Sequence, residues 1–201
     1  MARTAQIPSI EEAEAFHGHM CPGLAIGYRV AKAALAALGC ERPRDEELVA
    51  VVENDSCAVD AIQLVTGCTF GKGNLVFRDH GKHVYTFYDR NTGRGVRVSE
   101  DYRGFEEDAR LGELREAVSS GEPTEDQQEL YRTKMREKTD AILSAPVEQF
   151  LIITEVTDPP PPKARIEPSE RCAECGGPTM ASRLVEVAGR KLCRECAAGA
   201  E

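Results

Sequence analysis

The spacing of apolar residues changes its period along the chain, and these changes predict both helices and strands. Apolar residues that recur every three or four positions indicate helices, whereas short β-branched runs indicate strands. The predicted helices cover residues 9–16, 22–38, 58–66, 100–119 and 125–143. The predicted strands cover residues 48–52, 75–77, 84–88, 96–98 and 150–156. Because the two kinds of segment are mixed without regular alternation, we expect an α+β fold rather than a doubly wound sheet.

The ends of the first two helices carry residues that start or stop helices. Ser9 with Glu12 three residues later is the pattern of a capping box. Pro22 suits the first turn of the second helix, and Gly39 suits its end. Both helices are therefore defined by local sequence alone.

A β-rich stretch follows the third predicted helix. Strands 75–77 and 84–88 flank a turn around Gly81, which predicts a hairpin. His80 and His83 would then lie at the hairpin turn. Their H-x-x-H spacing could bind a metal ion, but exposed turn histidines are the more common case.

A run of four prolines in Asp158–Lys163 predicts a stiff linker. It divides the chain into a core domain at residues 1–157, a linker at 158–169 and a small C-terminal module at 170–201. We find no internal repeat.

Composition narrows the classes of function. Hydrophobic residues make up 41% and charged residues 29% of the chain, as in a globular protein with a real core. The net charge of -9 makes nucleic acid an unlikely partner, because phosphate binding needs a basic surface. No segment has the roughly 20 apolar residues of a membrane span, and the first residues lack the apolar run of a secretory signal. We therefore expect a cytoplasmic protein without a membrane partner, whose eight cysteines are reduced.

Four of these cysteines form two C-x-x-C pairs near the C-terminus. Cys172 and Cys175 are separated by seventeen residues from Cys193 and Cys196, a spacing typical of a four-thiolate zinc site. About thirty residues bury too little surface to fold alone, so a structural zinc ion would supply the folding free energy. Two disulfides or a redox C-x-x-C are the less favoured alternatives.

A second constellation precedes the helix 22–38. His17, His19 and Cys21 alternate with other residues, and Cys21 would lie at the start of the helix. Cys57 precedes the helix 58–66 in the same way. Helix N-termini favour thiolates, so both thiols should have lowered pKa values. Together these residues would suit zinc or a softer transition metal, whereas each one alone reads more simply as a buried thiol or a hydrogen-bonded imidazole.

Two further residues of this region are candidates for binding a substrate. Cys68 lies at the far end of the helix from Cys57, about 15 Å away, so the two should not share a metal ion within one subunit. Cys68 could instead face a pocket or a neighbouring subunit. Lys72 lies in a glycine-rich loop that lacks the spacing of a nucleotide-binding P-loop but could hold an anionic group.

These motifs resemble the FmdE family, which is named after a component of formylmethanofuran dehydrogenase. The resemblance rests on two stretches, FHGHMCPGLAIGYR and ENDSCAVDAIQLVTGCTFGKGNL, with the tail cysteines matching a treble-clef zinc finger found in some members. It implies an α+β core that forms homodimers, and a metal near the catalytic positions His17, His19, Cys21 and Cys57. Asp60, Cys68 and Lys72 would be pocket residues or partners of the ligands.

The family name implies a link to a molybdenum or tungsten oxidoreductase of one-carbon metabolism. Two kinds of function remain open. The first is a metal-dependent catalytic subunit with zinc or another transition metal in the core. The second is a non-catalytic accessory subunit that delivers metal to, or docks on, such an oxidoreductase.

Overall fold

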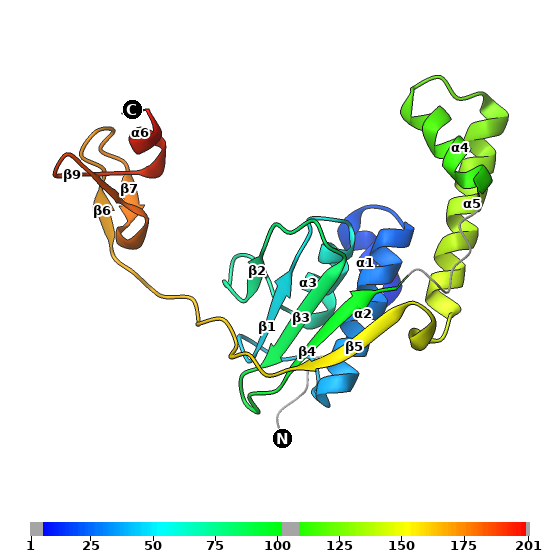
Figure 1. The fold of residues 1–201 in the computed structure, drawn as a ribbon, viewed down its shortest axis with the longest axis horizontal. Helices are drawn as coiled ribbons and strands as arrows, with labels where there is room; N and C mark the ends of the chain where they lie inside the picture. The colour runs from blue at the N-terminus through cyan, green and yellow to red at the C-terminus, as the bar shows by residue number, and fades with distance from the viewer. Residues whose placement is uncertain (1–5, 102–108, 200–201) are drawn as a thin grey trace. The chain divides into compact units, whose positions relative to one another are not determined.

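The computed structural model describes residues 6–101 and 109–199, and these residues divide into two compact units between Lys163 and Ala164. Both helices and a mixed sheet are present, so the predicted α+β class is confirmed (Figure 1). None of the described helices combines the length and the apolar character needed to cross a membrane.

The first unit follows the predicted order of elements. Its helices are α1 (Ile10–His17), α2 (Pro22–Leu38), α3 (Ala58–Thr66), α4 (Ala109–Ser119) and α5 (Glu125–Ser144), with the 3-10 turn η2 (Val147–Gln149). Its strands are β1 (Leu48–Val52), β2 (Leu75–Phe77), β3 (Val84–Asp89), β4 (Gly95–Glu100) and β5 (Leu151–Val156). Residues 102–108 of the predicted helix 100–119 lie outside the described residues.

The strands form one five-stranded sheet in the order β2-β1-β3-β4-β5. The predicted hairpin between β2 and β3 is wrong, because β1 lies between them. β2 pairs in parallel with β1, and β3 pairs with β1 antiparallel. Helix α3 connects β1 to β2, so these three elements form a parallel β-α-β unit. Gly81 still lies in a turn, with φ +63°. This turn belongs to the connection between β2 and β3, which lie on opposite sides of β1.

Strand β1 is buried along its whole length, as its unbroken apolar sequence predicts. Leu48, Ala50 and Val52 belong to the main core with α2 and α3, while Val49 and Val51 pack with residues on the opposite face. The helices α2 and α3 thus cover one face of the sheet (Figure 1).

Helices α2 and α3 approach closely because Gly27 has no side chain. A Cβ atom at Gly27 would overlap the Ala58 carbonyl oxygen and lie 2.5 Å from the Ala58 Cα, closer than any real contact. Ala58 is the first residue of α3. Gly27 therefore allows the start of α3 to lie directly against α2, and the helix starts carry Cys21 and Cys57.

The guanidinium of Arg29 ties α5 to α2. It donates hydrogen bonds to the carbonyl oxygens of Ile142 and Leu143 at 2.7 and 2.6 Å, and to that of Ala145 at 2.6 Å. These carbonyls end α5 and have no partner within the helix. A cation at a helix C-terminus also interacts favourably with the helix dipole. Arg29 thus stabilises both the end of α5 and its packing.

We expect Arg29→Ala to lower the free energy of unfolding by about 2 kcal/mol, because three charge-assisted hydrogen bonds are lost and carbonyls are left without partners. Urea unfolding followed by circular dichroism measures the change. Arg136→Ala removes an exposed cation of α5 and is the control, with an expected change within about 0.5 kcal/mol. Equal stability of the two variants would contradict the capping role.

The second unit contains β6 (Ser169–Arg171), β7 (Pro178–Met180), the 3-10 turn η3 (Ala181–Arg183), β8 (Val185–Val187), β9 (Arg190–Leu192) and α6 (Arg194–Ala198). Its strands form two hairpins, β6-β7 and β8-β9. The second hairpin turns at Ala188 and Gly189, both with positive φ, as the glycine predicts. The unit is a small scaffold for the tail cysteines.

Candidate metal centre

The turn between α1 and α2 brings three possible metal ligands together. Helix α1 ends at His17, and Gly18 reverses the chain with φ +96°, a conformation that glycine adopts without strain. His19 follows at once, and its ring centroid lies 4.6 Å from that of His17. The ligand atoms of His17, His19 and Cys21 all lie within 4.8 Å of one another. The predicted proximity of these residues is therefore present in the structure.

The two nitrogens of His17 have different partners. Its Nδ1 lies 2.7 Å from Asp60 Oδ2, and its Nε2 lies 3.9 Å from Cys21 Sγ. A carboxylate that accepts from Nδ1–H leaves Nε2 as a lone-pair donor directed at the thiol. Two ligands of one tetrahedral zinc ion, with Zn–S near 2.3 Å and Zn–N near 2.0–2.1 Å, would lie about 3.6 Å apart. The observed separation is close to that value.

Cys21 is the N-cap of α2, as predicted. Its Sγ accepts a hydrogen bond from the Leu24 amide at 3.4 Å. The sulfur thus lies beside the free backbone amides at the start of α2. Cys21 is thus well placed to be a metal ligand.

Cys57 differs from Cys21, and here one prediction is wrong. Its backbone is helical and its side chain makes no capping hydrogen bond to α3. Burial raises the pKa of the Cys57 thiol, and the adjacent Cys21 raises it further. The expected lowering of its pKa is absent because the thiol is partly buried, lies beside Cys21 and makes no capping hydrogen bond to α3.

Cys57 nevertheless lies beside the cluster. A Cβ atom at Gly23 would be 3.1 Å from Cys57 Cβ and 3.9 Å from its Sγ, so the start of α2 contacts the start of α3. Asp60, one turn further along α3, holds His17. Residues of three helices therefore meet here: His17 on α1, Cys21 at α2 and Asp60 on α3. Cys57 lies beside Cys21 but outside the group of ligand atoms that are all within 4.8 Å of one another.

Cys68 is apart from this cluster. Its side chain is fully buried in the main core, and its Sγ donates to the Leu48 carbonyl oxygen at 3.5 Å. Burial raises its pKa to about 11. The structure thus places Cys68 in the hydrophobic core and not in a pocket, which is the usual environment of a free cysteine.

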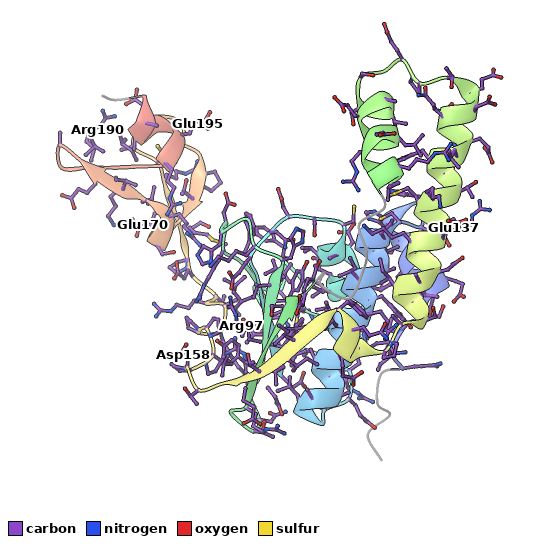
Figure 2. All side chains as sticks on the ribbon, turned by 45° about the vertical axis from the view of Figure 1, so that its right-hand side comes forward. Arg97, Glu137, Asp158, Glu170, Arg190 and Glu195 are labelled. Carbon is purple, nitrogen blue, oxygen red and sulfur yellow. The ribbon has the colours of Figure 1, made fainter. Side chains whose placement is uncertain are left out.

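His80 and His83 contact carboxylates individually. His80 Nδ1 lies 3.0 Å from Glu53, which also accepts from Arg97 at 2.7 Å. Arg97 projects from β4 (Figure 2). His83 Nδ1 lies 3.4 Å from Glu100. Neither histidine belongs to a potential metal cluster of the residues the structure describes.

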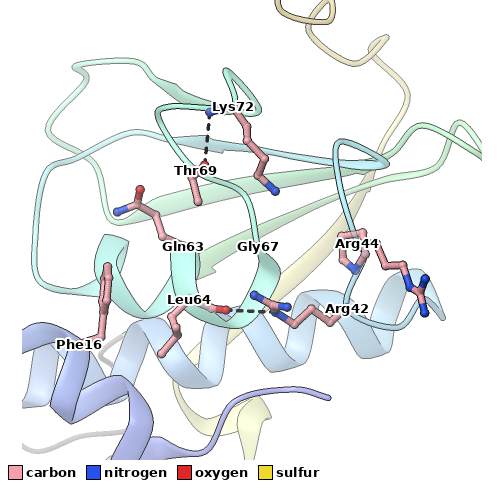
Figure 3. Close-up of a pocket in the computed structure, with 9 residues that line it drawn as sticks. Phe16, Arg42, Arg44, Gln63, Leu64, Gly67, Thr69 and Lys72 are labelled. Atoms are coloured by element: carbon pink, nitrogen blue, oxygen red, sulfur yellow. Dashed lines mark hydrogen bonds between the residues drawn. The ribbon is translucent and has the colours of Figure 1, made fainter. Parts of the chain in front are cut away.

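Lys72 lines a cavity of about 220 Å³ at the end of α3 (Figure 3). Arg42 and Arg44 contribute to the same cavity from the loop before β1, together with Phe16 of α1. We did not predict a role for these three residues. The only signal for the arginines is the R-P-R sequence at 42–44 within an otherwise acidic loop.

The four tail cysteines form the second cluster. Their Sγ atoms all lie within 4.8 Å of one another, with Cys175 and Cys193 at 4.0 Å. The amide of Cys193 donates to Cys172 Sγ at 3.2 Å, and the amide of Cys196 donates to Cys193 Sγ at 3.5 Å. Amide donors of this kind lower the pKa of the Cys172 thiol. Four closely placed thiols with backbone donors fit a closed structural zinc site.

Comparison with known families assigns the core domain and the tail separately. A profile described as FmdE, molybdenum formylmethanofuran dehydrogenase operon, matches residues 16–152, more than half of the chain. The chain belongs to the FmdE family. A second profile, the prokaryotic dksA/traR C4-type zinc finger, matches residues 165–201. The predicted family and the predicted zinc finger are both confirmed.

Two individual proteins extend the FmdE comparison. A probable S-adenosyl-L-methionine-binding protein of Archaeoglobus fulgidus is 32% identical over 193 residues, which cover 92% of this chain and 51% of the relative. The chain thus spans about half the length of this curated relative. The crystal structure of a tungsten formylmethanofuran dehydrogenase FmdE-like protein from Syntrophus aciditrophicus has a TM-score of 0.62 and 26% identity. That match covers 99% of this chain and 98% of the other.

Proposed function

We propose that the core domain is a metal-dependent catalytic subunit in which His17, His19, Cys21 and Cys57 hold zinc or another transition metal. The observation that carries the proposal is the arrangement of His17, whose Nδ1 is held by Asp60 at 2.7 Å while its Nε2 faces Cys21. A histidine oriented by a carboxylate and directed at a thiol is typical of metal sites.

The donor set fits such an ion. One thiol with amide support and two imidazoles suit zinc or a soft first-row metal, and Cys57 offers a second thiol. When bound, the ion would supply Lewis-acid chemistry to a thiol, carbonyl or water at an open position. His19 is exposed, so a substrate could replace it as a metal ligand. The released imidazole could then transfer protons to or from that substrate.

We also propose a setting for this activity. We place the chain in one-carbon metabolism linked to a molybdenum or tungsten oxidoreductase, in the cytoplasm and as a homodimer. The name of the Syntrophus aciditrophicus relative, which refers to tungsten formylmethanofuran dehydrogenase, supports this setting. The C4 zinc finger supports a second, structural zinc ion in the tail.

Metal analysis per chain tests the proposal. We expect two metal equivalents in the wild type and one in the Cys21→Ala, Cys57→Ala double variant, with the tail zinc retained. Cys40→Ala is the control, because Cys40 follows the end of α2 and lies outside both clusters. One equivalent per wild-type chain, all of it in the tail, would refute the core site.

A non-catalytic accessory role is the second candidate. The tail zinc finger favours it, since such modules often dock on other macromolecules. Co-purification of the full chain with a molybdenum or tungsten oxidoreductase, lost on replacement of Cys172 and Cys175 by Ser, would support this role. Turnover by the isolated protein would instead support the catalytic one.

A further inference from the structure

We propose that the cavity at the C-terminal end of α3 binds a carboxylate or phosphate group of the molecule that reaches the core metal site. The inference rests on the proposed function, since it assigns the substrate of that site to a class: elongated organic anions. The cavity is referred to below as the α3 cavity.

The α3 cavity is polarised along its length. Phe16 and Leu64 provide apolar surface at one end, and Phe16 as a residue is 57% exposed. Arg42 and Lys72 line the other side, and Arg44 lies at its rim with its guanidinium directed away from Lys72 (Figure 3). Gln63 and Thr69 add uncharged polar groups. None of the described lining residues is acidic, although the whole chain carries a net charge of -9. A local basic site in an acidic protein is selective for anions.

Arg42 and Lys72 retain donors for a ligand. Arg42 uses its Nε to donate to the Leu64 carbonyl oxygen at 3.2 Å, and its guanidinium lies against Gly67 at the end of α3. This contact offsets the negative end of the helix dipole, which would otherwise repel an anion. The Lys72 ammonium donates a long hydrogen bond, 3.3 Å, to the Asp45 carbonyl oxygen. An ammonium has three donors, so Lys72 can bind a ligand without losing this contact.

One nearby carboxylate competes with a ligand. This carboxylate belongs to Glu47. Hydrogen bonds from the Glu47 amide and from the Asp45 amide lower the pKa of Glu47, and the charge of Lys72 lowers it to a smaller degree. The Glu47 carboxylate accepts the Asp45 amide at 2.8 Å. Its charge is thus shared mainly with backbone donors of its own loop, which leaves the cationic side of the cavity available.

Helix α3 connects the α3 cavity to the metal centre. Asp60 contacts His17 near the start of the helix, whereas Leu64 and Gly67 lie at the cavity. Seven residues separate Asp60 from Gly67, which is about 10 Å along a helix. Phe16 lines the cavity and is the neighbour of His17 in the sequence. A ligand with its anionic group among the cations therefore needs a spacer of several atoms to reach the metal ligands.

Inorganic phosphate tests the anion site without any metal chemistry. We expect it to shift the backbone amide signals of Gly67 and Thr69 in a saturable way at low salt, in a ¹⁵N-labelled wild-type protein. The Arg42→Gln, Lys72→Gln double variant should bind at least about tenfold more weakly, because charge-assisted hydrogen bonds are lost. Arg136→Gln, which removes an exposed cation of α5, is the matched control and should bind as the wild type does. Shifts that do not saturate, or that survive in the double variant, overturn the anion site.

A series of mercaptoalkanoates of increasing chain length tests the link to the metal centre. Calorimetry measures their affinity for the zinc-loaded protein. The comparison is with alkanethiols of equal length that lack the carboxylate. We expect a carboxylate to strengthen binding about tenfold only when the chain is long enough to span α3, and this gain should vanish in the double variant. Equal affinities at every length, or no thiol binding, refute the link. If the core site holds no metal, the proposed function is refuted. The phosphate titration tests the anion site independently of that result.

Discussion

Gly27→Ala is expected to destabilise the core domain by about 3 kcal/mol. A methyl group at Gly27 would overlap the Ala58 carbonyl oxygen and lie 2.5 Å from the Ala58 Cα. These atoms are backbone and cannot rotate away, so α2 and α3 must separate by about 1 Å before normal contact is restored. The better helix propensity of alanine, at most about 1 kcal/mol, does not offset this loss of packing.

The same substitution should weaken metal binding in the core, because α2 carries Cys21 and α3 carries Cys57 and Asp60. Chemical unfolding and metal analysis on one protein preparation measure both effects. Gly112→Ala is the control: Gly112 lies in α4, and a Cβ atom there meets nothing within 4 Å. It should stabilise the protein slightly. A Gly27→Ala protein as stable as Gly112→Ala would show that the two helices are not held at the observed distance.

The helices of the core were predictable because their ends depend on neighbouring residues only. Ser9 and Glu12 form both hydrogen bonds of the predicted capping box. Gly39 takes the left-handed conformation that ends α2. Each of these interactions spans at most a few residues, so the sequence pattern specifies it without reference to the rest of the fold.

Strand pairing was not predictable in the same way. The sequence around Gly81 has the glycine and polar residues of a hairpin turn, but β1 inserts between the two strands. The parallel pairing of Ala50 with Leu75 depends on α3, which crosses the sheet between the two strands and packs on α2. Such a contact is determined by the burial of the helix face, which a local turn signal does not report.

The candidate site shows the same division. The closeness of His17, His19 and Cys21 follows from one short turn and was predicted from it. The different surroundings of Cys57 and Cys68 depend on tertiary burial: one thiol faces Cys21, and the other lies in the core. The sequence placed the two cysteines at opposite ends of one helix, but it could not show that the Cys68 thiol is buried in the core.

Asp60 is the residue whose replacement should change the core metal site most without removing a ligand. It lies 43 residues from His17 in the sequence and holds His17 Nδ1 at 2.7 Å. We expect Asp60→Asn to weaken metal binding in the core about tenfold and Asp60→Ala about a hundredfold, since the amide still accepts from Nδ1–H and the methyl group does not. Competition with a chromophoric chelator measures the affinity.

Asp55→Asn is the matched control for the charge. Asp55 is exposed and lies five residues before Asp60, so the variant removes one negative charge close to α3 without touching His17. Its core metal affinity should equal that of the wild type, and the tail zinc should be unchanged in every variant. If Asp55→Asn weakened metal binding as much as Asp60→Asn, the effect would be one of general charge. A loss confined to Asp60 means that the orientation of the imidazole determines the affinity, and that the contact between α1 and α3 is part of the metal centre.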